Sequence, residues 1–278
     1  METIAELRAR LSDARSAGKS IALVPTMGAL HDGHLALVRR AGELADVVVV
    51  SIFVNPLQFG PAEDLDRYPR DLDADVARLD ALDVDLVFAP SVAEMYPDGP
   101  VQTRVVAGAV AELYEGAARP GHFDGVLTVV DKLLNIVGPN VVLFGQKDAQ
   151  QVFLVQRMVA DLDLPVAVEV VPIVREPGGL ALSSRNRYLS EDQRQAAMGL
   201  SAALAAGTAS AGLGLEAVRA AALEAVDAQA LVKLEYLVIV DPETFLAVDA
   251  GYRGQARMLV AAIVGGTRLI DNGTIQLR

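Results

Sequence analysis

The feature that most constrains the fold is an alternation of apolar runs, each the length of one buried strand, with segments of helical periodicity. The apolar runs are nearly continuous, which is typical of strands covered on both faces in a parallel sheet. The strands are predicted at residues 21–25, 46–54, 84–89, 140–145 and 166–174, and the helices at 34–45, 71–82, 126–137 and 149–161. The sequence therefore predicts an α/β fold with a doubly wound parallel sheet.

A change in amino-acid composition divides the chain near residue 174. Residues 175–185 form a loop rich in Gly, Pro and Ser. Ser190 and Gln193 then form a predicted capping box at the start of an alanine-rich helix. The elements predicted beyond the loop are helices at 191–209 and 215–229 and strands at 234–240, 258–264 and 268–270. We expect two domains, residues 1–174 with the parallel sheet and a smaller α/β domain at 175–278.

Charge and cysteine content narrow the classes of function. The 278-residue chain has 24 basic and 36 acidic residues, a formal net charge of -12, which disfavours nonspecific binding to nucleic acid or an anionic membrane. The absence of cysteine excludes disulfides and a cysteine nucleophile and fits a reducing cytosol. Residues 1–18 read as a charged amphipathic helix, and no apolar run reaches the roughly 20 residues that span a bilayer. We expect a soluble, cytoplasmic protein.

The sequence PTMGALHDGH, residues 25–34, joins the first predicted strand to the first predicted helix. Such a corner presents backbone amides and the positive end of a helix dipole, and Gly28 and Gly33 let a ligand approach the backbone. His31 and His34 add donors that can be charged near neutral pH. They could instead be structural loop histidines. Zinc is disfavoured, because it needs three or four ligands and the chain has only one further histidine. The pattern favours a phosphate site.

Two further motifs carry polar groups suited to phosphate. GQKD, residues 145–148, would place Lys147 at the carboxyl end of a parallel strand, where α/β sheets bind ligands, and Gln151 would face the same corner. The alternative is a turn with a solvated lysine. LSSRN, residues 182–186, supplies two hydroxyls and a guanidinium from Arg185, although it could also be a capped turn with a surface arginine.

Three other segments contain candidate residues. FVNPLQFG, residues 53–60, includes Gln58, whose amide can bind both a hydroxyl and a carboxylate. EDLDRYPRDLDAD, residues 63–75, reads as a solvated acidic stretch from which a side chain could touch magnesium carried by ATP, without indicating a ligand. RPGHFDG, residues 119–125, reads as a loop before a helix, where His122 is either structural or part of an acceptor site.

The HDGH sequence resembles the signature of nucleotidylyltransferases and class I aminoacyl-tRNA synthetases, in which histidines steady a triphosphate while its α-phosphorus is attacked. The LSSRN loop, between the two expected domains, could close over leaving pyrophosphate, as the KMSKS loop does in the synthetases it resembles. Six motifs between residues 25 and 190 together resemble the pantothenate synthetase family, whose members join pantoate to β-alanine with ATP. These motifs are PTMGALHDGH, FVNPLQFG, DRYPR, RPGHFDG, LFGQKDAQQ and LSSRNRYLS. Leu182 stands where methionine is frequent, a swap of similar volume.

The resemblance implies a Rossmann-like catalytic domain, a C-terminal lid domain and a homodimer. It implies ATP with Mg²⁺, no tightly bound organic cofactor, the substrates pantoate and β-alanine, and no nucleic-acid or membrane partner. His34 would be the catalytic proton donor. The residues implied in catalysis with it are His31, Lys147, Ser183, Ser184 and Arg185. The residues implied to contact ATP are Met27, Gly28, Ala29, Leu30, His31, Asp32, Gly33, His34, Gly145, Gln146, Lys147, Asp148, Val174, Leu182, Ser183, Ser184 and Arg185. Gln58 and Gln151 would hold pantoate, and Gln58 would also lie near β-alanine.

The expected reaction has two steps, attack of the pantoate carboxylate on ATP to give pantoyl adenylate, then attack of the β-alanine amine to release AMP. One rival is another nucleotidylyltransferase, such as a phosphopantetheine adenylyltransferase, which would need a phosphate acceptor; Gln58, Gln151 and the second domain favour an organic acid instead. A catalytically silent nucleotide sensor is disfavoured by the intact set of polar residues. A tRNA synthetase is disfavoured by the acidity and short length.

Overall fold

The computed structural model describes residues 1–60, 65, 68–99 and 101–278, which group into two compact units. The first unit comprises Met1–Gln146 and Gln150–Pro172, and the second comprises Lys147–Ala149 and Ile173–Arg278. The second unit thus includes a short segment from the middle of the chain. The assignment of residues 1–174 and 175–278 as a catalytic domain and a lid stays a prediction.

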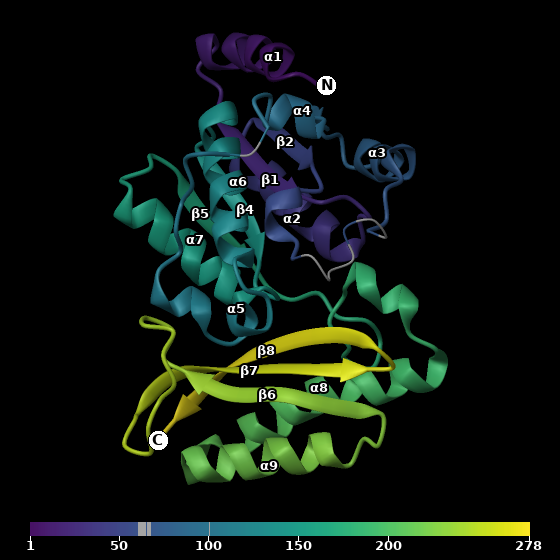
Figure 1. Cartoon of the computed structure of the whole chain (residues 1–278), viewed down its shortest axis with the longest axis vertical. Helices are drawn as coiled ribbons and strands as arrows, with labels where there is room; N and C mark the ends of the chain where they lie inside the picture. Colours follow the sequence, from purple (N-terminus) through teal and green to yellow (C-terminus); the bar gives the residue numbers. More distant parts are fainter. Residues whose placement is uncertain (61–64, 66–67, 100) are drawn as a thin grey trace. The chain divides into compact units, whose positions relative to one another are not determined.

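The first unit contains a five-stranded sheet in the order β3-β2-β1-β4-β5, and all its strand pairs are parallel (Figure 1). Its strands are β1 (Ile21–Thr26), β2 (Val47–Ile52), β3 (Leu86–Phe88), β4 (Val141–Gly145) and β5 (Ala167–Val171). Its helices are α1 (Ile4–Ser16), α2 (Asp32–Leu44), η1 (Pro56–Gln58), α3 (Leu72–Asp80), α4 (Val92–Met95), η3 (Ala109–Glu112), α5 (Glu115–Ala118), α6 (His122–Val137) and α7 (Ala149–Asp161). The predicted doubly wound parallel sheet is confirmed.

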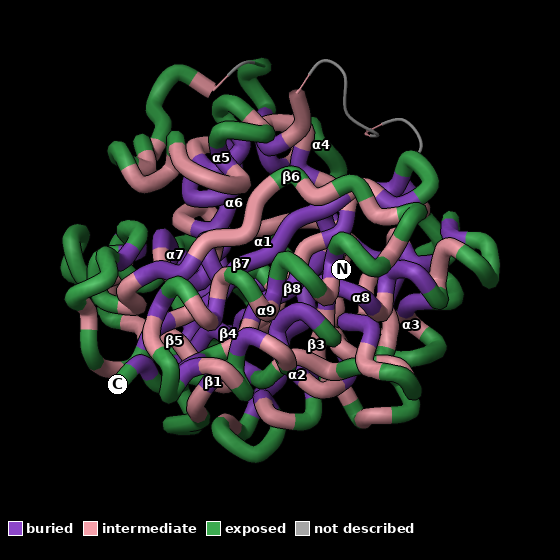
Figure 2. Tube along the Cα trace, turned by 90° about the horizontal axis from the view of Figure 1, so that it is seen from below, coloured by how far each residue is buried: buried purple, intermediate pink, exposed green. Residues whose placement is uncertain are grey.

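Both faces of this sheet are covered, as the continuous apolar runs predicted. The central strands β1, β2 and β4 are buried along most of their length. Figure 2 shows how buried and exposed residues are distributed along the chain. Because successive side chains of a strand point to opposite faces, Ile21 and Leu23 pack with α1, α6 and α7, whereas Ala22 and Val24 pack with α2 and Leu79 of α3. The sheet therefore needs no polar face, and its loops carry the polar chemistry.

The second unit is a small α/β unit of a different kind. Its three strands, β6 (Val232–Val240), β7 (Gly254–Val264) and β8 (Thr267–Leu277), form an antiparallel sheet in sequence order. Its helices are η4 (Ser184–Tyr188), α8 (Glu191–Ala209), η5 (Ala211–Leu213) and α9 (Leu215–Asp227). The helices α8 and α9 lie against one side of this sheet (Figure 1). The predicted capping box of Ser190 and Gln193 is confirmed at the start of α8.

Several element boundaries differ from the sequence predictions, including the start of α6 and the ends of β5 and β8. The helix α6 begins at His122, directly after the left-handed Gly121, so residues 122–125 are helical rather than loop. β5 ends at Val171, because Pro172 has no N–H for the sheet. β8 continues to Leu277, far beyond residue 270. Its second half alternates buried and exposed residues instead of forming an apolar run, so the apolar pattern indicated too early an end.

Candidate active site

The turn between β1 and α2 has an unusual backbone. Gly28 and Ala29 both have positive φ, 80° and 52°, and this conformation is strained for alanine. The N–H groups of Ala29 and Leu30 donate to the two carboxylate oxygens of Asp75 at 2.9 and 2.7 Å. A Cβ atom on Gly28 would lie 2.8 Å from Oδ2 of Asp75. One carboxylate therefore holds this turn in a conformation that fits no larger residue at position 28.

Asp75 is a functional candidate that the sequence analysis missed. The acidic stretch was expected to be solvated, and this is wrong for Asp75, which is only 4% exposed. The available signal was its spacing from the apolar Leu79, which lies one helical turn further along α3 and is also buried. Glu63, Asp64 and Asp66 of the same stretch lie outside the described residues.

His31 and His34 cap the N-terminus of α2 with each other. His31 is the N-cap residue, and its Nδ1 accepts the N–H of Gly33 at 3.2 Å. The Nδ1 of His34 accepts the N–H of His31 at 3.3 Å, and the two ring centroids are 4.1 Å apart. A ring nitrogen that accepts carries no proton, so each neutral imidazole has its proton on Nε2. The HDGH sequence thus sets the tautomer of both histidines.

The second polar corner lies at the end of β4. β4 is the neighbour of β1, and the strand order reverses between them, so this is the switch point where open α/β sheets bind ligands. Gly145 is the last residue of β4, and Gln146 donates its N–H to the carbonyl of Val171 at 2.8 Å. The Nζ of Lys147 lies 3.8 Å from Oδ1 of Asp148, both partly exposed. These residues occupy the position in the fold that the sequence predicted for them.

Two adjacent glutamines at the start of α7 have different surroundings. Gln150 is 3% exposed; its Oε1 accepts the N–H of Glu115 at 3.0 Å, and its Nε2 donates to the carbonyls of Val110 and Leu113 at 2.8 and 2.9 Å. Its amide is therefore used to hold residues 110–115. Gln151, the predicted pantoate ligand, is partly exposed.

Gln58 lies in a buried polar network. Its Nε2 donates to Sδ of Met27 at 3.1 Å, and its Oε1 accepts from Nδ2 of Asn55 at 3.2 Å. The Oδ1 of Asn55 accepts the Tyr96 hydroxyl at 2.8 Å. Burial raises the pKa of Tyr96 to about 12, so this hydroxyl remains a donor at neutral pH. The structure thus brings Gln58, predicted for the acid substrate, against Met27, predicted for ATP.

The backbone of Gln58 is held from the N-terminus of α6. Nδ1 of His122 lies 2.8 Å from the carbonyl oxygen of Gln58, and Nη1 of Arg119 lies 3.0 Å from Nε2 of His122. A carbonyl only accepts and a guanidinium only donates, so His122 is neutral with its proton on Nδ1. Of the two alternatives for His122, these contacts support the structural one.

Gly125 permits backbone contact between α6 and η1. A Cβ atom at Gly125 would lie 2.2 Å from the carbonyl oxygen of Leu57 and 2.7 Å from the backbone nitrogen of Gln58. The carbonyl of Gly125 also accepts from Nδ2 of Asn55 at 3.0 Å. The loop that carries Gln58 is therefore pressed directly onto the helix.

In the second unit the remaining predicted residues lie in and beside one small hairpin. Leu182 donates its N–H to the carbonyl of Val174 at 3.0 Å. Ser183 is the N-cap of η4, and its Oγ accepts the N–H of Arg185 at 3.2 Å. The structure therefore brings Val174 together with residues 182–185.

Asn186, the last residue of the LSSRN motif, ties this segment to its surroundings. It is 3% exposed, and its Nδ2 donates to Oε1 of Glu176 at 2.8 Å and to the carbonyl of Ala181 at 3.0 Å. The other oxygen of Glu176 accepts from Nη1 of Arg194 in α8. The loop is thus anchored through an ion pair.

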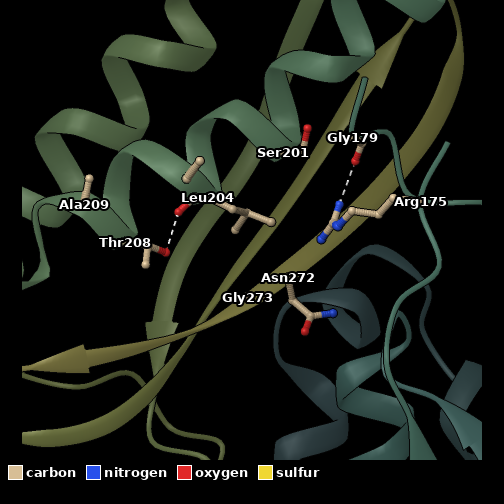
Figure 3. Close-up of a pocket in the computed structure, with 9 residues that line it drawn as sticks. Arg175, Gly179, Ser201, Leu204, Thr208, Ala209, Asn272 and Gly273 are labelled. Atoms are coloured by element: carbon tan, nitrogen blue, oxygen red, sulfur yellow. Dashed lines mark hydrogen bonds between the residues drawn. The ribbon is translucent and has the colours of Figure 1, made fainter. Parts of the chain in front are cut away.

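A groove of about 620 Å³ also lies in the second unit (Figure 3). Its lining residues are Arg175, Gly179, Ser201, Leu204, Ala205, Thr208, Ala209, Asn272 and Gly273. None of the residues predicted to contact ATP lines it, so this groove is distinct from the predicted ATP-binding residues.

Two searches of the described residues bear on cofactors and membranes. Within them, no three or more His, Asp or Glu side chains cluster in a way that could hold a metal ion. No helix in the same part of the chain is long and apolar enough to cross a bilayer.

Comparison with known proteins identifies the family. The model of the pantoate-beta-alanine ligase family matches residues 1–274. The chain belongs to this family. The pantothenate synthetase of Leifsonia xyli is 61% identical, with 100% of each chain covered, and that of Acidothermus cellulolyticus is 56% identical over 97% of this chain and 89% of its own length. The resemblance read from the six motifs is confirmed, as is the assignment of the chain to ATP-dependent ligases that join pantoate to β-alanine.

Solved structures of the ligase family agree with the fold. The crystal structure of pantothenate synthetase from Thermus thermophilus superposes with a TM-score of 0.92, at 51% identity and with 98% of each chain covered. The pantoate-beta-alanine ligase of Francisella tularensis, in complex with beta-gamma ATP and beta-alanine, superposes with a TM-score of 0.79 at 37% identity, covering 98% of this chain and 96% of that chain. Membership of the ligase family argues against the rival sensor and tRNA synthetase functions.

Proposed function

We propose that this chain activates pantoate as pantoyl adenylate and then transfers the pantoyl group to β-alanine. In the first step the pantoate carboxylate attacks the α-phosphorus of ATP and pyrophosphate leaves. A carboxylate is ionised at pH 7, so no general base is required. The observation that carries the proposal is the imidazole pair at the N-terminus of α2, a position suited to phosphate, where the Nδ1 contacts leave Nε2–H as the donor of each ring.

We assign the residues of this step in two groups. Negative charge collects on the α-phosphate and the leaving pyrophosphate, and His34, assisted by His31, would donate to it. The other donors proposed for the polyphosphate are Lys147, Ser183, Ser184 and Arg185. Preorganised donors of this kind stabilise a transition state without reorganisation during the reaction. The remaining proposed ATP contacts are Met27, Gly28, Ala29, Leu30, Asp32, Gly33, Gly145, Gln146, Asp148, Val174 and Leu182.

Pantoate would be held by the amides of Gln58 and Gln151, and β-alanine would bind next to Gln58. The support is that Gln58 is fixed on both sides, by Asn55 through its side chain and by His122 through its carbonyl. A fixed amide can orient the carboxylate for in-line attack. In the second step the neutral amine of β-alanine attacks the acyl carbon, and AMP leaves with the bridging oxygen.

The acyl adenylate hydrolyses in water, so closure of the second unit as a lid is proposed for the second step. Mg²⁺ would arrive with the ATP phosphates, and it supplies charge neutralisation there when bound. Asp75 is a poor candidate ligand, because both its oxygens accept backbone N–H groups. The homodimer and the cytoplasmic location also stay predictions.

An isotope experiment tests the reaction route. Pantoate labelled with ¹⁸O in its carboxyl group is supplied with ATP and β-alanine, and AMP is analysed by mass spectrometry. The adenylate route transfers one labelled oxygen to AMP. Unlabelled AMP, or label in inorganic phosphate, would overturn it.

His34→Ala tests the role of the imidazole pair. We expect loss of about 3 kcal/mol of transition-state stabilisation, seen as a large fall in pantoate-dependent exchange of pyrophosphate into ATP. The folded state should be kept, because the ring is partly exposed. Exchange close to that of the unmodified chain would contradict the assignment.

A further inference from the structure

Two adjacent buried polar residues of β8 have no role in the function proposed above. Asp271 and Asn272 are 4% and 3% exposed, and both belong to the second unit. β8 pairs with β7 without a bulge here, Val260 opposite Asp271 and Leu259 opposite Asn272. Successive side chains of a regular strand point to opposite faces. These two residues therefore serve different parts of the unit.

Asp271 holds the hairpin that leads into the LSSRN segment, residues 182–186. Its Oδ2 and Oδ1 accept from Nη1 and Nη2 of Arg175 at 2.6 and 2.9 Å, a two-pronged ion pair. Nη1 of Arg175 also donates to the carbonyl of Gly179 at 2.9 Å, in the turn of the hairpin (Figure 3). Arg175 and Ala181 form an antiparallel bridge, immediately before Leu182. Asp271 thus fixes the Arg175 side chain, which in turn binds the turn of the hairpin whose end carries residues 182–185.

Asn272 binds the backbone of Lys147, in the turn after β4 that we call the lysine turn. Its Nδ2 donates to the carbonyl oxygen of Lys147 at 3.0 Å, and its Oδ1 accepts from Nη1 of Arg257 at 2.7 Å. Both partners fix the amide orientation, because a carbonyl only accepts and a guanidinium only donates. The N–H of Asn272 donates to Oδ1 of Asp271 at 2.7 Å, which links the two residues. The Lys147 backbone is therefore attached to β8.

We propose that Asp271 and Asn272 are positioning residues for the adenylation step, each placing one group of polyphosphate donors. Asn272 acts through Lys147, and Asp271 acts through Arg175 on residues 182–185. The inference rests on the proposed function, because it takes from it the assignment of these donors to the polyphosphate. It adds that the C-terminal strand sets the spacing of the donors of the second unit.

A purely structural role makes a different prediction. Loss of a buried hydrogen bond lowers stability in any case, and unfolding would reduce both half-reactions together. A positioning role affects ATP use and leaves the capture of a supplied pantoyl adenylate by β-alanine unchanged. The ratio of the two half-reactions is therefore the measurement that separates the two roles.

The first test is Asn272→Asp, which keeps an acceptor for Arg257 and removes the donor to Lys147. We expect the KM for ATP in pyrophosphate exchange to rise about tenfold or more, an expectation for a misplaced binding group, while aminolysis of supplied pantoyl adenylate stays within about twofold. Thr274→Val, an exposed position on the same strand, is the matched control and should change neither rate. Equal loss in both half-reactions, or an unchanged KM, would overturn the proposal.

A double-mutant cycle with Lys147→Met tests whether Asn272 acts through the lysine. In the Lys147→Met background, Asn272→Asp should have little further effect on the KM for ATP. Additive effects would overturn the proposed route, since the new carboxylate would then be repelling ATP directly. If Lys147→Met itself leaves the KM unchanged, the proposed function of Lys147 fails, and this outcome is distinct from failure of the positioning role.

The Asp271 arm is tested with the double variant Arg175→Met, Asp271→Leu. Replacing both charges avoids leaving one buried charge unpaired, so the folded state should be kept. Thermal unfolding of the variant reports on folding, and the two half-reactions report on positioning. We expect a raised KM for ATP with near-normal aminolysis. A variant with full ATP use, or one that loses both half-reactions equally, would overturn the role of Asp271.

Discussion

The loop at residues 26–34 and the loop at residues 182–186 both offer donors to a phosphate, yet they are held by different means. The first is fixed by backbone N–H groups that meet the Asp75 carboxylate and by histidine caps within the loop. The second is fixed by side chains, the Glu176 to Arg194 ion pair and the amide of Asn186. The Asp75 carboxylate is buried, whereas the Glu176 to Arg194 ion pair is partly exposed, so added salt should weaken the support of the second loop more than that of the first.

The elements that follow the two loops reinforce this difference. The first loop leads into α2, a helix of 13 residues with a full N-terminal dipole. The second leads into η4, a 3₁₀ helix of five residues. We infer that the first loop supplies the field of a helix N-terminus, whereas the second supplies charge from its side chains.

Asp75→Asn should have the largest effect, because it removes the brace of the first loop. An amide has one acceptor oxygen, so its NH₂ group would face one of the two N–H donors. We expect pyrophosphate exchange to fall by about 100-fold and the free energy of unfolding to fall by about 1 to 3 kcal/mol, measured by isotope exchange and denaturant titration. Asp73→Asn, exposed on the same helix, is the control. Unchanged exchange would show that the loop holds its own conformation.

Gly125→Ala should have the next largest effect, because the new methyl group would overlap the Leu57 carbonyl. We expect a loss of about 1 to 3 kcal/mol in unfolding free energy and a rise in the KM for pantoate that exceeds the rise for ATP. Steady-state kinetics with each substrate varied in turn measures both. Gly42→Ala is the control, since nothing lies within 4 Å of a Cβ atom there. A greater effect on ATP than on pantoate would argue against the link between α6 and Gln58.

Glu176→Gln tests the second loop and should have a smaller effect. The amide keeps an acceptor for Asn186 and loses the charge that pairs with Arg194. Because this ion pair is partly exposed, we expect its loss to cost about 0.5 to 1 kcal/mol, seen as a two- to fivefold rise in the KM for ATP. The difference between the variant and the unmodified chain should become smaller as salt is added. Glu216→Gln breaks an exposed pair with Arg219 and serves as the control. A loss as large as that of Asp75→Asn would erase the proposed difference between the loops.

Tyr96→Phe should have the smallest effect on the KM values at neutral pH. The lost hydrogen bond to Asn55 should lower the free energy of unfolding by about 1 kcal/mol. The pKa of Tyr96 is raised from 10.0 to about 12 by burial, so the folded state holds the phenol proton more tightly. This stabilisation is complete below pH 10 and is lost as the pH rises from about 10 through about 12. Unfolding measured from pH 8 to 12 should therefore show a shallower alkaline decline in the variant. Tyr188→Phe, half-exposed, should leave the decline unchanged.

The parts of the fold that sequence could predict depend on local signals. β1 and the strand-to-helix corner at HDGH were predictable, because an apolar run, two glycines and two histidines lie within fourteen consecutive residues, 21–34. Asp75 was missed because its partners Ala29 and Leu30 are more than 40 residues away in the chain. The brace at Asp271 and Asn272 was missed for the same reason. The length of β8 was missed because Asp271 and Asn272 are polar, and polar residues after an apolar run indicate the end of a strand when their buried hydrogen-bond partners are not known.

The sequence indicated which ligands the predicted residues bind better than it indicated which contacts hold those residues in place. The motifs suggested the types of ligand that Gln58 and Lys147 would meet, since amides and ammonium groups have few suitable partners. They gave no indication that His122 holds the carbonyl of Gln58, because that contact requires the helix α6 to start three residues after Arg119. The contact that fixes the Gln58 carbonyl depends on how α6 packs against η1, and the local sequence does not show that packing.

The grouping of Lys147–Ala149 with the C-terminal residues has a practical consequence for dissecting this ligase. The chain passes between the two units at three peptide bonds, after Gln146, after Ala149 and after Pro172. A gene fragment that starts at residue 173 would therefore lack the segment that Asn272 binds, and a fragment that ends at 172 would leave the lysine turn without its partner. Half-chains and domain swaps cut at this boundary would separate a lysine from its support, so point variants in the intact chain are the sound way to study the two units.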